Sequence, residues 1–179
     1  YRDFGKDRYL AVQIGQYVAA DEQVVWGPRT LLNSVAVAQV RAVWDGVRDR
    51  IVIVYQLAST GDLTSTVCTI NTSTSGQSSA IHTSGDYAPA TATAVDVSAV
   101  TRLAVVANCD DTAGNTGHVL VTWDSGTRIR AKVGYVSGTY YNTVTWHSTV
   151  QEIDDQHNHY NDSLAWDTNI DRGISTYYG

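Results

Sequence analysis

The stretch that decides the fold is Trp44-Asp45-Gly46-Val47-Arg48-Asp49-Arg50, which continues into Ile51-Val52-Ile53-Val54-Tyr55. A second copy reads Trp166-Asp167-Thr168-Asn169-Ile170-Asp171-Arg172 and continues into Gly173-Ile174-Ser175-Thr176-Tyr177. In each copy a Trp-Asp pair opens a polar turn, the turn ends at Arg, and a strand-like stretch follows. This pattern predicts a β-hairpin, and its recurrence predicts a repeat architecture.

Two weaker copies extend the pattern. One runs from Val95-Asp96 to Arg102 and continues through 103–107, and Tyr1-Arg2-Asp3 matches the end of another. The copies recur roughly every 50 residues, with a longer last interval that we interpret as a loop insertion. The expected units are 1–34, 35–85, 86–154 with the insertion near 110–124, and 155–179 as the start of a further unit.

Each complete unit is expected to hold four short strands. In the second unit these are 40–44, 50–56, 63–71 and 78–83, and the apolar run 51–54 is typical of a strand buried on both faces. The first unit supplies 9–18 as a third strand and 24–26 with 30–32 as a fourth; the third unit supplies 129–137 and 143–147. Gly15 and Gly134 fall at equivalent positions, as do Trp26 and Trp146.

These strands predict an all-β protein of about three four-stranded antiparallel blades, like those of a β-propeller. Propeller rings typically need about 4–8 blades, so we expect the chain to be part of a larger ring or assembly. An open solenoid or a fibre of stacked sheets is the alternative architecture. Trp44 and Trp166 are expected in the core, while Trp26 and Trp146 recur at one position of the unit and are expected to be packing residues.

The composition excludes two classes of partner. The chain has 179 residues, of which 43% are hydrophobic and 17% charged, and its net charge is −6. An acidic chain lacks the basic face that a nucleic-acid backbone requires, and no apolar run reaches the ~18 residues that span a bilayer. The chain has no Met and starts within a repeat, so we expect it to be a piece of a longer protein.

The repeat resembles a family of β-propeller repeats with a Tyr-Arg-Asp signature, found in phage tail and receptor-binding proteins and in large extracellular multi-repeat proteins. The matching segments are Trp44-Asp45 to Tyr55, Trp166-Asp167 to Tyr177, Tyr1-Arg2-Asp3 and Val136-Ser137-Gly138. The family motif is structural and carries no catalytic residues. The resemblance implies a place outside the cell or on a virion surface, with other subunits, further blades or a cell-surface glycan as partners.

These observations predict a non-enzymatic structural or adhesive module of an extracellular assembly. A component of a virion, such as a phage tail or fibre, would present its loops to a receptor or partner protein. One alternative is a carbohydrate-binding, lectin-like propeller, and a second is a fragment of a glycoside hydrolase. The sequence contains no Gly-x-Ser-x-Gly nucleophile elbow, no His-Glu-x-x-His zinc motif and no phosphate-binding loop.

The densest polar cluster is 154–162, which contains Asp155, His157 and His159. The two His residues lie two positions apart, so in a strand they would face one side. Together with a carboxylate they could ligate a transition metal. The segment also coincides with a connection between blades, where a solvated loop or the rim of a ligand-binding site is expected.

A second oxygen-rich segment, 110–117, contains Asp110, Asp111 and Asn115. We expect no cofactor overall, and Ca²⁺, which oxygen ligands of this kind suit, is the alternative. The ligand spacing of an EF-hand loop is missing, so a simple turn and a ligand-binding loop both stay open.

Tyr140 and Tyr141 lie in a predicted turn and have no counterpart in the other units. Aromatic rings stack on the apolar faces of sugars, so these residues are candidate glycan contacts. Asn71 and Asn161 begin glycosylation sequons in predicted turns, which makes them candidate glycosylation sites.

The two cysteines, Cys68 and Cys109, stand at different places in their units. We interpret them as small buried hydrophobic residues. A disulfide between neighbouring units is the alternative, and it would indicate an oxidising compartment.

Overall fold

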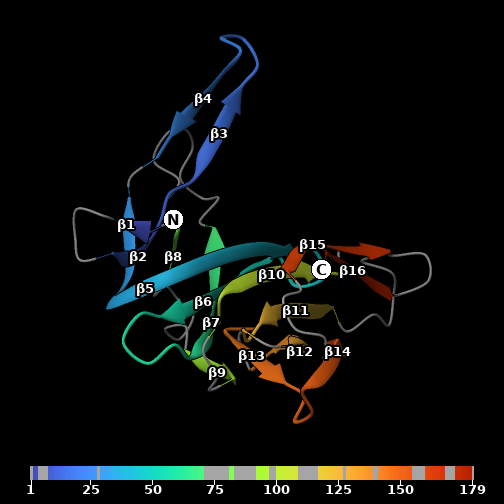
Figure 1. Ribbon diagram of the computed structural model, residues 1–179. Helices are drawn as coiled ribbons and strands as arrows, with labels where there is room; N and C mark the ends of the chain where they lie inside the picture. The colour runs from blue at the N-terminus through green and yellow to red at the C-terminus, as the bar shows by residue number, and fades with distance from the viewer. Residues whose placement is uncertain are drawn as a thin grey trace.

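The computed structural model is an all-β protein whose strands form several open antiparallel sheets (Figure 1). It describes residues 2–3, 8–27, 29–70, 81–82, 92–96, 100–108, 117–126, 128–138, 141–154, 160–167 and 172–178. No helix occurs in these ranges. The predicted all-β fold is therefore confirmed.

The largest sheet has seven strands in the order β1-β2-β5-β6-β7-β8, and β9 also pairs with β7. Its strands are β1 (Arg2–Asp3), β2 (Tyr9–Val12), β5 (Thr30–Asp45), β6 (Arg50–Leu57), β7 (Leu63–Ile70), β8 (Ile81–His82) and β9 (Thr93–Asp96). Strand β5 is long, and residues 34–43 with their recurring Val lie within it.

The second sheet has the order β10-β11-β12-β13, and β14 also pairs with β12. Its strands are β10 (Arg102–Ala107), β11 (His118–Asp124), β12 (Ile129–Ser137), β13 (Thr143–Trp146) and β14 (Gln151–Asp154). Two further pairs stand apart: β3 (Gly15–Val18) with β4 (Gln23–Trp26), and β15 (Tyr160–Asp167) with β16 (Arg172–Tyr178). The β3–β4 hairpin projects away from the rest of the molecule (Figure 1).

Strand β6 is buried on both faces, as its continuous apolar run predicts. Val52 and Val54 belong to the larger hydrophobic cluster, whereas Ile53 and Tyr55 belong to a second cluster on the opposite face. Successive side chains of a strand point to opposite faces, so one short run serves two cores. The first core lies between the two large sheets and includes Trp123, which is fully buried.

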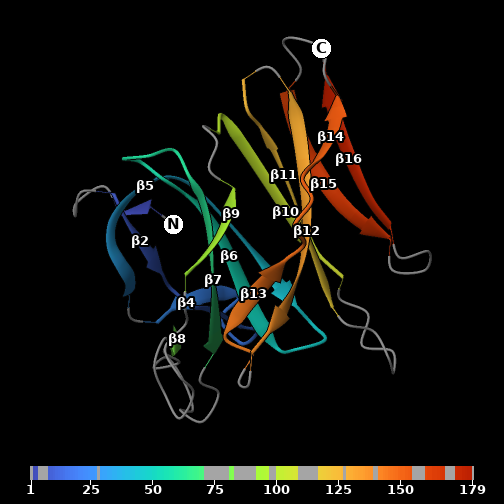
Figure 2. The same cartoon turned by 90° about the horizontal axis from the view of Figure 1, so that it is seen from below.

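The two large sheets meet where strand β10 of the second sheet lies alongside β5 of the first sheet. Strand β10 also lies alongside β15 of the β15–β16 pair. Figure 2 shows the sheets standing next to one another in chain order. Further out, β13 contacts β7, and the indole N–H of Trp146 donates a hydrogen bond of 2.9 Å to the hydroxyl of Ser65.

The two strong copies of the repeat form matching hairpins. Asp45 pairs with Arg50 across the β5–β6 turn, and Asp167 pairs with Arg172 across the β15–β16 turn. The third copy, expected from Val95-Asp96 to Arg102, is wrong. Strand β9 pairs with β7, whereas β10 pairs with β11 in the other sheet, because Val95 and Leu103 both enter the core between the sheets.

The third strands of the units are also equivalent. The outer edge of β7 carries β9 at its start and β8 at its end, and the outer edge of β12 likewise carries β14 and β13. The matching pairs are Ser65 with Thr93 and Ala131 with Gln151. In the first unit, β2 and the start of β5 show the same pairing, Val12 with Thr30.

Gly15 and Gly134 are equivalent in the structure as well, and so are Trp26 and Trp146. Gly15 pairs with Trp26 and Gly134 pairs with Trp146, each across two antiparallel strands. A Cβ at Gly134 would lie 2.6 Å from Cε3 of Trp146, so the indole ring folds over the bare glycine. A large ring thereby fills the space that a missing side chain leaves in the sheet.

Three further expectations need correction. Residues 118–124, which we assigned to an insertion, form β11 with Val119, Val121 and Trp123 in the core. The strand expected over 9–18 is divided into β2 and β3, which pair with different strands. Trp44 is 41% exposed and is not a core residue, whereas Trp166 is half-buried.

Trp123, and not Trp44, is a core residue, and the stability of alanine variants can test this assignment. Trp123→Ala should lower the free energy of unfolding by about 3–5 kcal/mol, because it empties a fully buried indole site. Trp44→Ala should cost only about 1 kcal/mol, because a large part of its ring stays in water. Urea denaturation followed by circular dichroism gives both values, and equal losses would contradict the assignment.

The Gly-Trp pairs predict unequal effects of one substitution at equivalent positions. Gly134→Ala should lower the free energy of unfolding by about 1–3 kcal/mol, because the half-buried Trp146 and the Thr145 carbonyl oxygen leave no room for a Cβ. Gly15→Ala should cost less than about 1 kcal/mol, because Trp26 is exposed and can move away. Thermal or urea denaturation compares the two variants, and a larger loss at Gly15 would refute this account.

Candidate functional site

Several turns of different units gather at one end of the sheets, which we call the turn end. They are the β5–β6 turn (46–49), the β10–β11 connection where Gly117 leads into β11, and the turn after β12 that holds Tyr141. Pairing brings the end of β12 next to the start of β11, since Tyr135 lies opposite His118. The turn end is the candidate functional site because its side chains come from units far apart in the chain.

Asp45 organises the β5–β6 turn. Its Oδ1 accepts hydrogen bonds from the backbone N–H groups of Val47 (3.0 Å) and Arg48 (3.3 Å), which holds the chain in a tight turn. The Asp45 side chain is fully buried, and this burial raises the pKa of its carboxyl above the ordinary value. The two backbone hydrogen bonds and the nearby Arg48 and Arg50 act in the opposite direction but more weakly.

Gly117, which precedes β11, lies against the β5–β6 turn. Its backbone has a φ of +60°, which favours glycine, and an added Cβ would lie 2.9 Å from Oδ1 of Asp45 and 3.0 Å from Cβ of Val47. The backbone of the second sheet thus closes directly over the buried carboxylate of the first sheet. Any larger residue at 117 would separate the two turns.

Tyr141 contributes an aromatic ring from the turn after β12. The guanidinium of Arg48 lies 4.8 Å from the ring centroid, and that of Arg50 lies 5.9 Å from it. Both distances allow a cation–π interaction. Tyr141 is therefore held in place by the β5–β6 turn while 39% of its surface stays exposed.

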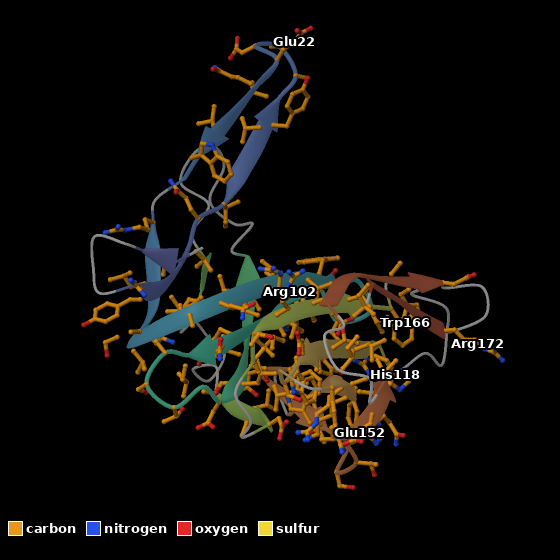
Figure 3. All side chains as sticks on the ribbon, in the orientation of Figure 1. Glu22, Arg102, His118, Glu152, Trp166 and Arg172 are labelled. Carbon is orange, nitrogen blue, oxygen red and sulfur yellow. The ribbon has the colours of Figure 1, made fainter. Side chains whose placement is uncertain are left out.

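A second aromatic contact joins the β15–β16 hairpin to the same end. The rings of His118 and Trp166 are stacked with centroids 6.4 Å apart and an angle of 12° between their planes. Figure 3 shows the two residues close together, with Arg172 beyond them. Three successive units therefore contribute polar and aromatic side chains to the turn end.

The turn end can bind by stacking and hydrogen bonding. The guanidinium of Arg48 can donate hydrogen bonds to hydroxyl or acidic groups, and the exposed part of Tyr141 offers a flat apolar surface beside it. Among the described residues there is no group of three or more His, Cys, Asp or Glu side chains that could hold a metal ion.

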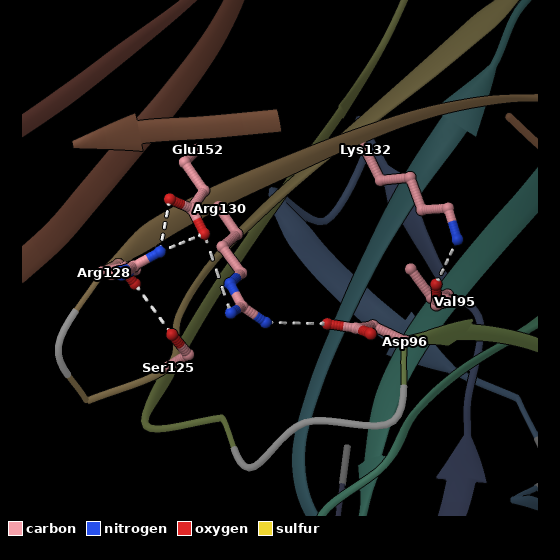
Figure 4. A network of polar contacts seen from close by, with 7 residues as sticks. All are labelled: Val95, Asp96, Ser125, Arg128, Arg130, Lys132 and Glu152. Atoms are coloured by element: carbon pink, nitrogen blue, oxygen red, sulfur yellow. Dashed lines mark hydrogen bonds and ion pairs between the residues drawn. The ribbon is translucent and has the colours of Figure 1, made fainter. Parts of the chain in front are cut away.

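A second polar cluster lies at the outer edges of the two large sheets and joins them (Figure 4). Nη1 of Arg128 donates hydrogen bonds to both carboxylate oxygens of Glu152 in β14, each at 2.6 Å. This hydrogen bonding lowers the pKa of the Glu152 carboxyl. Across the sheets, Arg130 reaches Asp96 of β9 at 3.7 Å, and Lys132 donates to the carbonyl oxygen of Val95 at 2.6 Å. These cations are engaged within the chain, so the cluster connects sheets and is not a candidate binding site.

The structure places some of the residues predicted for a site and leaves others undescribed. Tyr141 lies at the turn end. The remaining candidates fall outside the described residues: Tyr140, Asp155, His157, His159, Asp110, Asp111, Asn115, Asn71 and Cys109. Asn161 lies in β15, opposite Tyr177, and not in the turn that we expected.

The described residues that flank the His-containing segment lie far from Tyr141. The His-containing segment is flanked by Asp154, which pairs with Ile129, and by Tyr160, which pairs with Tyr178. Both flanking pairs stand at the end of the sheets opposite Tyr141, because β12 runs from Ile129 to the turn end. The histidines themselves lie outside the described residues, so their prediction as ligand-binding residues stays a prediction.

Sequence reasoning missed the contact between Arg48 and Tyr141. These residues belong to different units and lie far apart in the chain, so no local pattern connects them. The same holds for Gly117 and Asp45. A repeat pattern predicts the hairpins but contains no signal for which turns of neighbouring units touch.

Cys68 is a buried free thiol in β7. Burial raises its pKa to about 12, which keeps it protonated and unreactive at neutral pH. The interpretation of Cys68 as a small buried hydrophobic residue is confirmed.

Comparison of this chain with models of protein families, with curated proteins and with solved structures found no match. Within the described residues, no helix has the length and apolar character needed to cross a membrane.

The buried carboxyl of Asp45 predicts a pH effect of defined sign. Its pKa is higher in the folded than in the unfolded chain, so its contribution to stability is complete below the usual pKa of Asp and is lost as pH rises through the folded pKa. Asp45→Asn keeps an oxygen acceptor but cannot ionise. The unfolding free energy of the natural protein minus that of Asp45→Asn should therefore decrease as the pH is raised from about 3 to 7.

Urea denaturation at several pH values measures this difference. Asp45→Ala is the control, because it also removes the acceptor for two backbone N–H groups and should cost about 1–3 kcal/mol. A difference between the natural protein and Asp45→Asn that increases with pH would show that the carboxylate is stabilised in the folded chain.

Proposed function

We propose that this chain is a non-enzymatic structural and adhesive module of an extracellular assembly, namely a component of a virion appendage such as a phage tail or fibre. Its sheets are blades of a β-propeller-like repeat within a larger ring or assembly. Its partners are further blades or subunits, and a glycan at the cell surface is the receptor class that its chemistry suits.

One observation carries the propeller-like part of this proposal. The first strands of three successive units, β5, β10 and β15, lie side by side, while β8, β9, β13 and β14 occupy the outer edges. A radial repeat places the first strand of each blade near a common axis and the last strand at the rim. The chain runs from the outer strand β9 directly into the inner strand β10, as such a repeat requires.

The adhesive part of the proposal is supported by the turn end. In radial repeats, connections at one end of the blades supply the binding surface, while the sheets supply a rigid support. Tyr141 with Arg48 offers an exposed ring beside a hydrogen-bond donor, which suits a sugar with one apolar face and several hydroxyls. The same feature favours a lectin-like propeller that acts alone as the second candidate function.

Glycan binding and glycan integrity test the proposed function together. The purified chain is applied to a glycan array, and the bound glycans are then recovered and analysed by mass spectrometry. We expect intact glycans and a loss of about tenfold in affinity for Tyr141→Ala. Tyr17→Ala is the matched control, because Tyr17 is an exposed tyrosine on the β3–β4 hairpin, remote from the turn end.

Two results would overturn the proposal. Shortened glycans after binding would identify a glycoside hydrolase. A chain that binds no glycan and joins no larger particle in electron micrographs would have neither the adhesive nor the structural role. Glycan binding by an isolated single chain would favour the lectin-like propeller over the virion component.

A further inference from the structure

Arg48 carries a charge that no ion pair neutralises in the described part of the chain. Its guanidinium lies 4.8 Å from the ring centroid of Tyr141, and its Nε is buried without a hydrogen-bond partner. The ion pairs among the described residues belong instead to Arg128 and Arg130. Buried donors are normally hydrogen-bonded, so a guanidinium in this state points to an acceptor that is not part of the described structure.

The buried carboxyl of Asp45 does not supply this acceptor. Its Oδ1 accepts hydrogen bonds from the backbone N–H groups of the β5–β6 turn, and its Oδ2 is buried without a hydrogen-bond partner. Asp45 and Arg48 are near enough to attract each other electrostatically, yet the described ion pairs do not include them. The donors of Arg48 are therefore left for an acceptor from outside the described chain.

The aromatic ring beside Arg48 is held in a fixed position. Tyr141 has a φ of +52°, which is uncommon for a bulky residue, and its backbone N–H donates a hydrogen bond of 3.1 Å to the carbonyl oxygen of Gly138. Such conformations persist only where the surroundings hold them, and they are frequent at binding sites. With 39% of Tyr141 exposed, a ligand meets a preorganised apolar surface next to a cation.

We propose that Arg48 and Tyr141 bind an acidic sugar, a pyranose ring that carries a carboxylate, and that Arg48 recognises the carboxylate. The proposal names the ligand class of the adhesive function proposed above and rests on that function. A planar carboxylate matches the guanidinium fork and can accept two parallel hydrogen bonds of about 2.7–2.9 Å. Because the carboxyl is attached directly to the sugar ring, the ring can contact Tyr141 while the carboxylate reaches the neighbouring Arg48.

The acidic character of the whole chain does not oppose such a ligand. The net charge is −6, but charges farther than about 8 Å from the ligand are largely screened at physiological salt. The described charges close to the site are Arg48, Arg50, Asp45 and Asp49, all of the β5–β6 hairpin. Asp45 is buried and Asp49 is exposed, so Asp49 is the described carboxylate of this hairpin that would repel the ligand from the surface.

Matched ligands test the role of the carboxylate. Calorimetry measures the affinity of the purified chain for a galacturonic acid oligomer and for a sialylated trisaccharide, which carry the same group on different sugars. Each is compared with its own methyl ester. We expect at least one of the two acids to bind, and its ester to bind about tenfold more weakly, because esterification removes the charge from the acceptor. Added salt should weaken binding of the acid more than binding of the ester.

Variants of the β5–β6 hairpin test which residue recognises the carboxylate. Arg48→Gln should lower the affinity for the acid about tenfold and change the affinity for the ester less than about twofold. Asp49→Asn should raise the affinity for the acid about two- to fivefold, because it removes a nearby negative charge. Asn also tolerates the φ of +53° at this position, so the turn should be kept.

Arg41→Gln is the matched control, because it removes the same charge from an exposed arginine of β5 that lies four residues before Asp45, about 13 Å along the strand. It should change neither affinity. Should Arg48→Gln fail to fold, Arg48→Lys keeps the charge but lacks the planar fork, and it should bind the acid more weakly than the natural protein does. The comparison of acid with ester needs no variant.

The possible failures are distinguishable. Binding of neutral glycans that requires Tyr141 but responds neither to esterification nor to Arg48→Gln would overturn the acidic-sugar proposal and leave the adhesive function standing. Equal affinity for a sulfated sugar or for an acidic peptide would show that charge alone is recognised, and it would overturn the proposal as well. A chain that binds neither acidic nor neutral glycans would contradict the adhesive function itself.

Discussion

The central strand β6 buries both of its faces, and the rest of the structure depends on this burial. Val52 and Val54 face the core between the large sheets, while Ile53 and Tyr55 face a second core that includes Leu10 and Cys68. Each fully buried apolar side chain of this size contributes about 1.5–3 kcal/mol. A strand with two apolar faces needs a cover on each side, which is why one sheet alone could not be stable.

The same requirement explains where the two large sheets meet. Trp123 of β11 enters the core opposite β6, and Trp146 extends this contact to β7. The polar contacts lie around this core. Asp45 and Gly117 close the turn end, and Arg130 and Lys132 join the sheets at their outer edges. Hydrophobic burial therefore brings the sheets together, while these directional contacts determine which turns and edges are neighbours.

The repeat also relates the stable centre of the molecule to its exposed parts. Trp146 and Trp26 stand over glycines in the same way, but only Trp146 has a neighbouring sheet to cover it. Equivalent residues thus differ in burial because their surroundings differ. The exposed hairpin and the edge of β16 are two places where the pattern of the central sheets is not completed within the described residues.

Much of the strand pattern follows from the sequence by local physical rules. The hairpin from Trp44 to Tyr55, the strand 129–137 and the matching Gly-Trp positions are all visible, because alternation and turn residues act over a few neighbours. The exposure of Trp44 and the membership of β9 in the first sheet were not predictable in this way. Both depend on which sheet packs against which, and no short stretch of sequence contains that information.

For the candidate site, most of the decisive contacts could not be predicted from the sequence. The sequence by itself identified Tyr141 as an unrepeated turn residue, since that conclusion needs only a comparison of the units. Only the tertiary structure decided that Arg48 and Arg50 lie over its ring and that Gly117 closes over Asp45. Those contacts join residues of different units, whose proximity results from the packing of whole sheets and not from local chain preferences.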